Sequence, residues 1–479
     1  MSKIVWSEYQ KAIFEEVKSG TGHCIINARA GSAKTSSLLE SLKYIPSNKK
    51  TLVVAFNKKI ADELKLKCNY PHIEISTLHS FGFKIVKKSI SNIKLDTDKS
   101  FKVIKNILNG LKSNSKERDD FDTIFEIRKC VSLCKNTFTS SSTKIDDLMD
   151  DFDISSGSLE REVFISTVIK VLDECKKDQK SIDFDDMIYF PLALNLPIDK
   201  YDVVMIDESQ DASISQINLS LLACKEGGRV ISFGDSEQVL YSFLGIELDS
   251  LSNLQKKLNA RQLSLPISYR CAKSIIFKAQ RLVPDITYAP NAIDGKVVNI
   301  VEDELLKLIQ KGDFIISRTN AALVKWCLKL WKNKIPASIK GKDLAPMLNG
   351  IIKQSKKKNI KSFLTWLDIW ETNELSRLKA KNKDTKLVSD KVECLKILSE
   401  NKNTVNELLD TIKSLLDNKN EGNVVSLFTI HGSKGLESNR VFFLTSTMVF
   451  GNGKEEKNCE YVAMTRAKSE LYLVSKSQK

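Results

Sequence analysis

Long apolar runs are missing from this chain of 479 residues, and their absence excludes a helix that spans a bilayer. The first residues, MSKIVWSEYQKAIFEEV, carry charges within their first turns and so do not resemble a secretory signal. We therefore expect no membrane partner and an intracellular, cytoplasmic location, or the interior of a host cell if the source is a virus.

Histidine and paired cysteines are also scarce. The sequence has four histidines, and its ten cysteines form no C-x-x-C pair. A chain of this length can build hydrophobic cores without a disulfide scaffold. The spacing favours buried free thiols in a reducing compartment over a zinc site or a disulfide framework, at about nine to one.

The composition is that of a globular protein with an excess of positive charge. Hydrophobic residues make up 42% of the chain and charged residues 28%, and the length predicts two or more compact units. Lysine and arginine number 74 against 60 acidic residues, which gives a net charge of +14. This charge favours a polyanionic partner, although a basic surface that only faces water explains it about equally well.

Short β-rich runs alternate with helix-like segments, which is typical of parallel sheets. We expect strands at Cys24–Asn27, Leu52–Phe56, Asp202–Ile206, Val230–Phe233, Asp313–Ser317, Val424–Thr429, Arg440–Thr445 and Leu471–Val474. These runs fall into two groups, so the sequence predicts an α/β protein with two lobes.

Two segments lack the strand pattern and have helical spacing, which predicts mainly helical insertions. The expected first lobe comprises residues 1–99 and 176–262, with an insertion at 100–175. The expected second lobe comprises residues 263–335 and 422–479, with an insertion at 336–421.

A turn rich in Gly, Ala and Ser follows the apolar run HCIIN and leads into a helix-forming segment. This order is typical of a phosphate-binding loop, whose backbone N–H groups cradle phosphate oxygens at a helix N-terminus. Lys34 would reach the β- and γ-phosphates of ATP, and Thr35 would hold Mg²⁺. The candidate nucleotide-binding residues of the loop are Ala30, Gly31, Ser32, Ala33, Lys34, Thr35 and Ser36.

The loop departs from the usual pattern G-x-x-x-x-G-K-[ST], because Ala28 and Ala33 stand where that pattern has glycine. An alanine with a left-handed backbone at position 33 would cost about 1–2 kcal/mol, whereas a helical one would cost little. The sequence leaves this choice open.

Two adjacent carboxylates follow the apolar run YDVVMI, in the order Asp207 and Glu208. The carboxyl ends of strands are where α/β sheets bind ligands. Asp207 can bind Mg²⁺, and Glu208 can orient and deprotonate an attacking water, which are two roles that ATP hydrolysis requires. Taken alone, the pair is equally explained as a solvated acidic turn.

The segment Asp207–Asp211 resembles the DExQD box of superfamily 1 UvrD/Rep-like DNA helicases, and other motifs stand in the order of that family. Upstream, WSEYQKAIF resembles the Q motif, VVAFNKKIADEL motif Ia and STLHSFG motif Ib, and IDFDDMI is also typical of the family. Downstream, FGDSEQVLYSFLG resembles motif III, LPISYRC motif IV, SLFTIHGSKGLE motif V and EEKNCEYVAMTRAK motif VI. The resemblance extends from Gln10 to Lys468.

This resemblance implies two RecA-like lobes, with ATP in the cleft between them and single-stranded DNA across their top. The roles that it implies for ATP are adenine contact by Gln10, stacking by Tyr269, ribose binding by Glu437 and γ-phosphate sensing by Gln238. Arg270 and Arg466 match two arginines that reach the γ-phosphate. A planar cation at that position stabilises the charge that develops on the transferred group.

The same resemblance predicts the residues that contact DNA. They are Phe56, Asn57, Thr77, His79, Tyr241, Phe243 and His431. Aromatic stacking tolerates any base, as a translocating motor requires. Relatives often carry tryptophan where Phe243 stands, a basic residue where Leu244 stands and asparagine where Ser268 stands.

The sequence therefore predicts an ATP- and Mg²⁺-dependent translocase, active as a monomer, that moves 3′ to 5′ on single-stranded DNA and unwinds partial duplexes. The direction and the choice of DNA come from the resemblance. Two alternatives remain: an ATP-inactive subunit that binds single strands, suggested by Ala28 and Ala33, and a motor that acts on RNA. The second insertion is shorter than in large bacterial relatives, and no nuclease domain is expected after the last motif.

Overall fold

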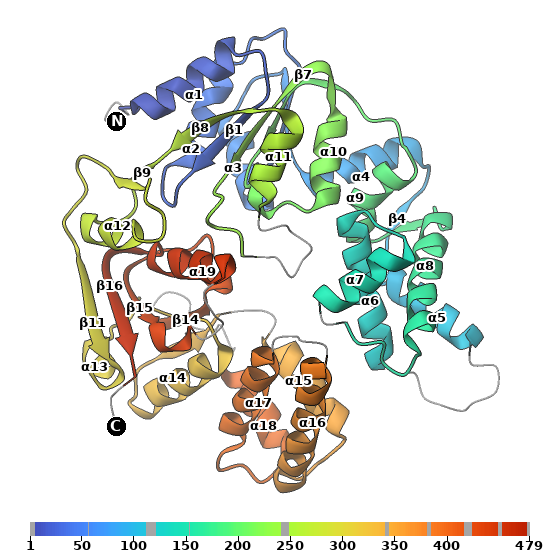
Figure 1. The fold of residues 1–479 in the computed structure, drawn as a ribbon, viewed down its shortest axis with the longest axis vertical. Helices are drawn as coiled ribbons and strands as arrows, with labels where there is room; N and C mark the ends of the chain where they lie inside the picture. The colour runs from blue at the N-terminus through green and yellow to red at the C-terminus, as the bar shows by residue number, and fades with distance from the viewer. Residues whose placement is uncertain are drawn as a thin grey trace. The chain divides into compact units, whose positions relative to one another are not determined.

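The computed structural model describes residues 5–55, 57–111, 121–152, 154–240, 249–340, 344–380, 385–415, 424–448 and 453–476. The chain divides into two compact units (Figure 1). Unit 1 comprises Met1–Ala28 and Ala33–Leu265, and unit 2 comprises Arg29–Ser32 and Pro266–Lys479. Each unit contains a sheet of six parallel strands.

The sheet of unit 1 has the strand order β3-β2-β6-β7-β1-β8. Its strands are β1 (Cys24–Ala28), β2 (Thr51–Ala55), β3 (Ile73–Thr77), β6 (Tyr201–Ile206), β7 (Cys224–Gly234) and β8 (Arg261–Leu265). Alternate residues of β2 enter two different cores, Val53 on one face and Leu52 and Val54 on the other. Because both faces are covered, the central strands are continuous apolar runs.

Helices pack on both faces of this sheet. On the face of Val53 lie α1 (Glu8–Ser19), α2 (Lys34–Ser41) and α3 (Lys58–Lys67). On the opposite face lie α4 (Leu78–Ser89), α9 (Phe184–Ala193) and α10 (Ile214–Ala223), while α11 (Ser250–Leu258) packs near Ile25 of β1.

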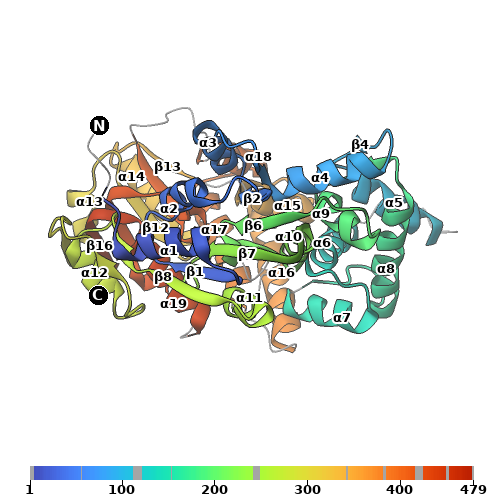
Figure 2. The same cartoon turned by 90° about the horizontal axis from the view of Figure 1, so that it is seen from above.

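A helical bundle interrupts unit 1 between α4 and α9. It consists of α5 (Lys99–Leu111), α6 (Phe121–Thr137), α7 (Ser142–Asp151) and α8 (Arg161–Lys177), grouped beside α4 and α9 in Figure 2. Ile127, Val131 and Cys134 of α6 recur at helical spacing and enter a core that belongs to the bundle alone. Strands β4 (Lys94–Leu95) and β5 (Ser181–Ile182) pair in parallel and bring its two ends together.

A buried ionic cluster joins this bundle to α9. Lys135 of α6 and Lys99 of α5 are each 1% exposed. The Nζ atom of Lys135 lies 3.0 Å from Asp183 Oδ2 and 2.8 Å from Asp186 Oδ1, and Lys99 Nζ lies 2.9 Å from Asp186 Oδ2. Burial opposes the charge of Lys135, but the carboxylates outweigh it and raise the pKa of Lys135 above its usual value. The junction is therefore held by paired charges that would be costly to bury alone.

The sheet of unit 2 has the strand order β11-β16-β15-β12-β14-β13. Its strands are β11 (Lys296–Val301), β12 (Phe314–Ser317), β13 (Ala337–Ile339), β14 (Val425–Thr429), β15 (Ser438–Leu444) and β16 (Ala467–Ser475). The helices of this lobe are α12 (Lys273–Ala279), α13 (Glu302–Leu308), α14 (Asn320–Lys332) and α19 (Lys454–Met464). Two short strands, β9 (Ile267–Ser268) and β10 (Thr287–Tyr288), form a separate parallel pair.

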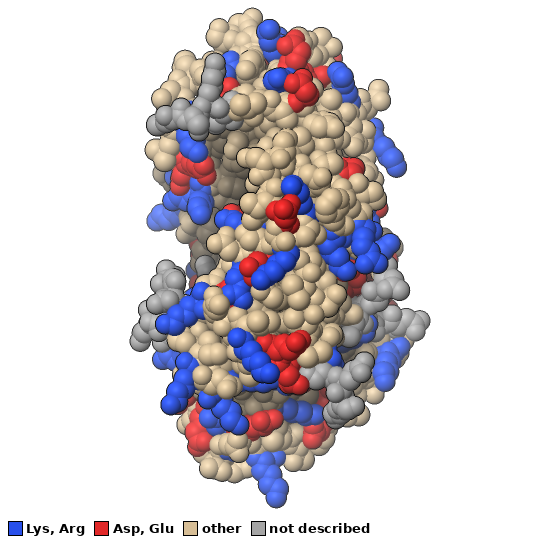
Figure 3. Space-filling model, turned by 90° about the vertical axis from the view of Figure 1, so that its left-hand side faces the viewer, with Lys and Arg blue, Asp and Glu red and all other residues tan. Residues whose placement is uncertain are grey.

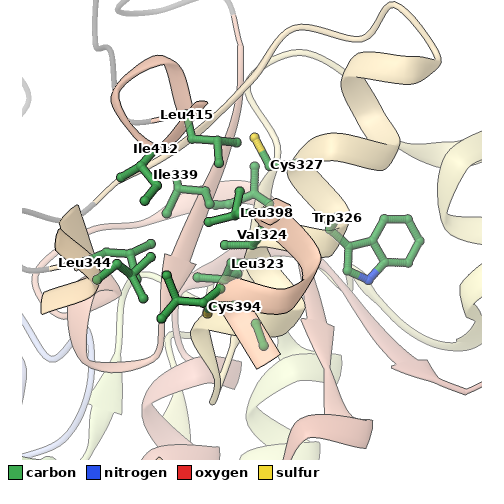
Figure 4. Packing of buried hydrophobic residues seen from close by; sticks show 14 of the residues in the cluster. Leu323, Val324, Trp326, Cys327, Ile339, Leu344, Cys394, Leu398, Ile412 and Leu415 are labelled. Carbon is green, nitrogen blue, oxygen red and sulfur yellow. The ribbon is translucent and has the colours of Figure 1, made fainter. Parts of the chain in front are cut away.

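A second set of helices is inserted between β13 and β14. It consists of α15 (Leu344–Ser355), α16 (Ile360–Ala380), α17 (Lys386–Ser399) and α18 (Val405–Leu415). Unlike the first bundle, it shares one hydrophobic core with its lobe. Figure 4 shows Leu323 and Val324 of α14 packed with Cys394 and Leu398 of α17.

A carboxylate of α17 also caps α14. The side chain of Asp390 accepts hydrogen bonds from the backbone N–H groups of Asn320 at 2.9 Å and Ala321 at 2.8 Å. A negative charge at this end of a helix is stabilised by the helix dipole. The second insertion is thus tied to its lobe by both apolar packing and a buried carboxylate.

The predicted α/β fold with two parallel-sheet lobes is confirmed, and each expected strand overlaps a strand of the structure. Phe56, the last residue expected in β2, lies outside the described residues. Strands β3, β8, β11 and β13, which lie at the edges of the two six-stranded sheets, were not expected from the sequence. Nor was the grouping of Arg29–Ser32 with unit 2.

Two further expectations concern cysteines and membranes. All ten cysteines are free thiols, and all except Cys68 and Cys224 are buried. Among the helices of the described ranges, none is both long and apolar enough to cross a membrane.

The ionic cluster predicts a large difference between two lysine substitutions. Lys135→Met leaves buried carboxylates without their main cation, so we expect a loss of about 3 kcal/mol in the free energy of unfolding. Lys88→Met removes an exposed pair with Asp199, at 2.7 Å, and should cost less than about 1 kcal/mol. Urea unfolding followed by circular dichroism measures both, and equal losses would show that the cluster does not stabilise the junction.

Candidate functional site

The candidate phosphate loop joins β1 to α2, and its last residue has a left-handed backbone. Ala33 has φ 57° and ψ 36° and forms the N-cap of α2, which begins at Lys34. Alanine has no side chain that can accept a hydrogen bond from the N–H groups of the first helical turn. Those groups, which include Thr35 and Ser36, and the positive end of the helix dipole suit an anion such as phosphate.

This conformation answers the question that the sequence left open. A left-handed alanine costs about 1–2 kcal/mol. Ala28, the other alanine at a position where the usual motif has glycine, lies in β1 and pays no such cost. Only Ala33 is therefore strained, whereas Gly31, with φ 73°, is a residue that adopts positive φ readily.

The tip of the loop, Arg29–Ser32, belongs to unit 2. Within that unit the Ala30 N–H donates to the hydroxyl of Tyr461 at 2.9 Å. Ser32 is 2% exposed, and its hydroxyl has no hydrogen-bond partner among the described residues.

Lys34 lies between the two predicted carboxylates, which follow β6. Its Nζ atom forms an ion pair with Glu208 and lies 3.9 Å from Asp207 Oδ1. The side chains of Lys34 and Asp207 are 13% and 0% exposed. Burial alone would lower the pKa of Lys34, but the carboxylates of Glu208 and Asp207 raise it above its usual value. The structure thus brings together the lysine and the carboxylates that the sequence singled out.

Asp207 has the properties of a cation ligand. Burial raises the pKa of Asp207 to about 6, and neither carboxylate oxygen accepts a hydrogen bond from a side chain in the described part of the chain. A divalent cation would satisfy these oxygens. No group of three acidic, histidine or cysteine side chains that could enclose a metal is present among the described residues. A single buried carboxylate such as that of Asp207 suits Mg²⁺, which proteins commonly hold through one or two carboxylates together with substrate phosphates.

Gln10, expected at adenine, is anchored at the start of α1. Its Oε1 accepts from the backbone N–H of Ser7 at 3.0 Å, which completes a capping box. Its Nε2 donates to Ser37 Oγ of α2 at 2.9 Å, and the residue is 2% exposed. Gln10 therefore ties α1 to the helix that follows the phosphate loop.

In unit 2, main-chain hydrogen bonds connect three segments that are far apart in the sequence. The Ala272 N–H donates to the carbonyl of Lys468 at 2.8 Å, and the Ser438 N–H donates to the carbonyl of Arg466 at 3.0 Å. These bonds fix the loop after β9, the start of β15 and the start of β16 beside one another. Candidate residues from the three predicted motifs are therefore neighbours.

The two candidate arginines have different surroundings. Arg270 Nε lies 2.6 Å from Glu437 Oε2, and its side chain is 21% exposed. Arg466 is 1% exposed and donates through Nε to the carbonyl of Val462 at 3.0 Å. Burial, and then the charge of Arg270, lower the pKa of Arg466 to about 10, so it stays a cation at neutral pH. Tyr269, expected to stack on adenine, is 43% exposed.

Of the residues expected to contact nucleic acid, two cap helices at one edge of the unit 1 sheet. Asn57 follows β2 and accepts from the Ile60 N–H at 2.9 Å, while Thr77 ends β3 and accepts from the Ser80 N–H at 3.2 Å. Because β2 and β3 are adjacent parallel strands, these side chains lie at the same edge.

The other candidates are two histidines and three aromatic residues. His79 lies in the first turn of α4, where burial lowers its pKa. In unit 2, His431 follows the carboxyl end of β14. Phe56, Tyr241 and Phe243 lie outside the described residues, as does Leu244.

Two models of protein-family domains match this chain. Residues 9–259 match the model of the UvrD/REP helicase N-terminal domain, and residues 425–474 match that of the UvrD-like helicase C-terminal domain. The first match alone covers more than half of the chain. This chain belongs to the UvrD/REP helicase family.

Curated relatives carry helicase names. The ATP-dependent DNA helicase Rep of Buchnera aphidicola subsp. Baizongia pistaciae is 24% identical over 346 residues, which cover 64% of this chain and 49% of that protein. The ATP-dependent DNA helicase PcrA of Bacillus subtilis is 26% identical over 292 residues, which cover 56% of this chain and 38% of that protein. The chain therefore spans about half, or less, of the length of these relatives.

Around the carboxylates of this UvrD/REP family member, two residues were missed by sequence reasoning. Gln210 donates through Nε2 to Glu208 Oε2 at 2.6 Å and accepts through Oε1 from the Asp235 N–H at 3.1 Å. Asp235 in turn accepts from Gln238 Nε2 at 2.7 Å. Gln210 thus links Glu208 to the end of β7, where the expected phosphate sensor Gln238 lies. The position of Gln210 in the DESQD segment was the sequence signal that could have identified it.

The two alanines of the loop predict opposite effects of glycine. Ala33→Gly should raise the free energy of unfolding by about 1 kcal/mol, because it removes the left-handed strain. Ala28→Gly should lower it by about 1 kcal/mol, because a buried strand residue loses packing and gains unfolded-state freedom. Thermal unfolding of the two variants measures the difference, and a loss of stability in Ala33→Gly would contradict the assigned strain.

Proposed function

We propose that this UvrD/REP family member is an ATP-dependent DNA helicase and translocase that moves 3′ to 5′ on single-stranded DNA. ATP hydrolysis drives movement and strand separation. The observation that carries the proposal is the ion cluster of Lys34, Asp207 and Glu208 at the carboxyl ends of β1 and β6.

The cluster suggests how phosphate binding activates the base. Lys34 forms an ion pair with Glu208. A γ-phosphate that takes over Lys34 leaves Glu208 able to accept a proton from the attacking water, while Gln210 holds the other side of that carboxylate. Asp207 and Thr35 would hold Mg²⁺. When bound, Mg²⁺ neutralises charge on the phosphate oxygens. In this arrangement the base is released only when substrate is present.

The remaining nucleotide contacts follow the family. Gln10 and Tyr269 bind adenine, Glu437 binds ribose, and Gln238 senses the γ-phosphate. Arg270 and Arg466 of unit 2 act on the transferred phosphoryl group, where a guanidinium stabilises developing negative charge. The loop amides from Ala30 to Ser36 bind the phosphate oxygens.

DNA is proposed to bind at the strand ends that carry Asn57, Thr77, His79 and His431, together with Phe56, Tyr241 and Phe243. On the face shown in Figure 3, Lys and Arg side chains are interspersed with Asp and Glu, so charge alone does not mark a binding surface there. Stacking on bases and contacts to phosphates supply the grip. The proposed substrates are single-stranded and partial-duplex DNA, and the proposed active form is a monomer.

The intact ion cluster argues against an ATP-inactive strand-binding subunit. Ala33 strains the loop by about 1–2 kcal/mol but leaves Lys34 beside both carboxylates. A protein that bound single-stranded nucleic acid without hydrolysing ATP would gain nothing from burying these charges. RNA as the substrate is opposed by the DNA helicase names of the relatives.

Substitution of the base tests this function. Glu208→Gln should lower ATP turnover at least about 100-fold, because the amide cannot accept the proton of the attacking water. Binding to a single strand should remain within about twofold, because no nucleic-acid contact is removed. The measurement is steady-state ATP hydrolysis with and without single-stranded DNA or RNA, alongside strand binding by fluorescence anisotropy.

The matched control is Glu226→Gln, an exposed glutamate of β7 in the same unit, which should hydrolyse ATP at the wild-type rate. Undiminished turnover in Glu208→Gln would remove Glu208 from the mechanism. Stimulation by RNA but not by DNA would replace the proposed substrate.

A further inference from the structure

The carboxylate of Glu437 in unit 2 is shared by two cations. Its Oε2 lies 2.6 Å from Arg270 Nε, and its Oε1 lies 2.7 Å from Lys468 Nζ. Lys468 is the last residue of the motif VI segment, but no role at the site was expected for it. Its contact with Glu437 therefore requires an explanation of its own.

The backbone brings the two cations together. The carbonyl of Lys468 accepts from the Ala272 N–H at 2.8 Å, two residues after Arg270. The Arg270 guanidinium also donates through Nη1 to the carbonyl of Thr465 at 3.3 Å. Arg270 and Lys468 thus stand on main chains that are hydrogen-bonded to each other, with Glu437 between their side chains.

Glu437 competes with a phosphate for the Arg270 guanidinium. If Arg270 leaves, Glu437 loses one of its two cations. Burial alone would raise the pKa of the Glu437 carboxyl, but Lys468 and Arg270 hold that pKa below its usual value. Buried Arg466 is close enough to Arg270 for their like charges to oppose each other. A second cation on Glu437 lowers the cost of separating Arg270 from it, because the carboxylate keeps a partner.

We propose that Lys468 is a positioning residue that makes Arg270 available to the transferred phosphate by holding the Glu437 carboxylate when Arg270 leaves it. This inference rests on the proposed function. It also couples ribose recognition to catalysis. A ribose hydroxyl that donates a hydrogen bond to Glu437 would further weaken the ion pair between Glu437 and Arg270.

The test is a set of ATPase measurements on Lys468 variants of the full chain. Lys468→Met should lower the DNA-stimulated kcat about fivefold with little change in KM for ATP, because Glu437 then competes more strongly for Arg270. Lys468→Arg, which keeps the cation, should restore most of the kcat. The side chain of Lys468 is 41% exposed, so these variants should fold.

Removal of the Glu437 carboxylate distinguishes a positioning role of Lys468 from a structural one. In a Glu437→Gln background, Arg270 is no longer held, so Lys468→Met should have no further effect on kcat. The matched control is Lys296→Met, which removes a lysine that is 49% exposed and paired with Glu470 at 3.2 Å in the same unit. Its kcat should equal that of the wild type.

Three results would overturn the inference. An unchanged kcat in Lys468→Met would show that Arg270 needs no such help. An equal loss with and without Glu437 would show that Lys468 acts on the fold and not through the carboxylate. Absence of ATP turnover in the wild-type chain would overturn the proposed function and this inference with it, whereas the first two results leave the function standing.

Discussion

The buried charge of Lys34 requires the two carboxylates beside it, and this requirement determines the arrangement of the candidate site in unit 1. Parallel strands bring the loop after β1 and the carboxylates after β6 to one edge of the unit 1 sheet. The charges of Lys34, Asp207 and Glu208 are stable there only because they are close together. In the proposed mechanism, a phosphate that takes Lys34 leaves Glu208 with the hydrogen bond from Gln210. The same pairing keeps Lys34 charged, as the proposed contact with a phosphate requires.

Unit 2 has the opposite arrangement of charge, because there two cations share one carboxylate. Arg270, Arg466 and Lys468 gather cations at one place, and Glu437 is the carboxylate that two of them share. Hydrogen bonds between main chains, and not the side chains alone, determine this arrangement. Helices α15 to α18 share a core with this lobe, so the second insertion is part of its packing. In each unit a rigid sheet holds exchangeable ion pairs.

The two parallel sheets and the proximity of Lys34 to Asp207 and Glu208 could be predicted from sequence, because central parallel strands are continuous apolar runs and the motifs are local. What could not be predicted depends on three-dimensional context. The residues around Ala33 are compatible with either a helical or a left-handed backbone, and only the structure shows φ 57°. Lys135 and Asp183 are 48 residues apart, and a buried pair at that separation leaves no local pattern. Edge strand β8 was missed because its RQLSL segment has few apolar residues.

The central claim is that ATP hydrolysis at Lys34 and Glu208 drives movement in one direction along a single strand. Unwinding of two partial duplexes, identical except that one has a 3′ single-stranded tail and the other a 5′ tail, tests this claim most directly. With ATP and Mg²⁺, we expect the 3′-tailed duplex to be separated and the 5′-tailed duplex to remain paired. Efficient separation from the 5′ tail alone would contradict it.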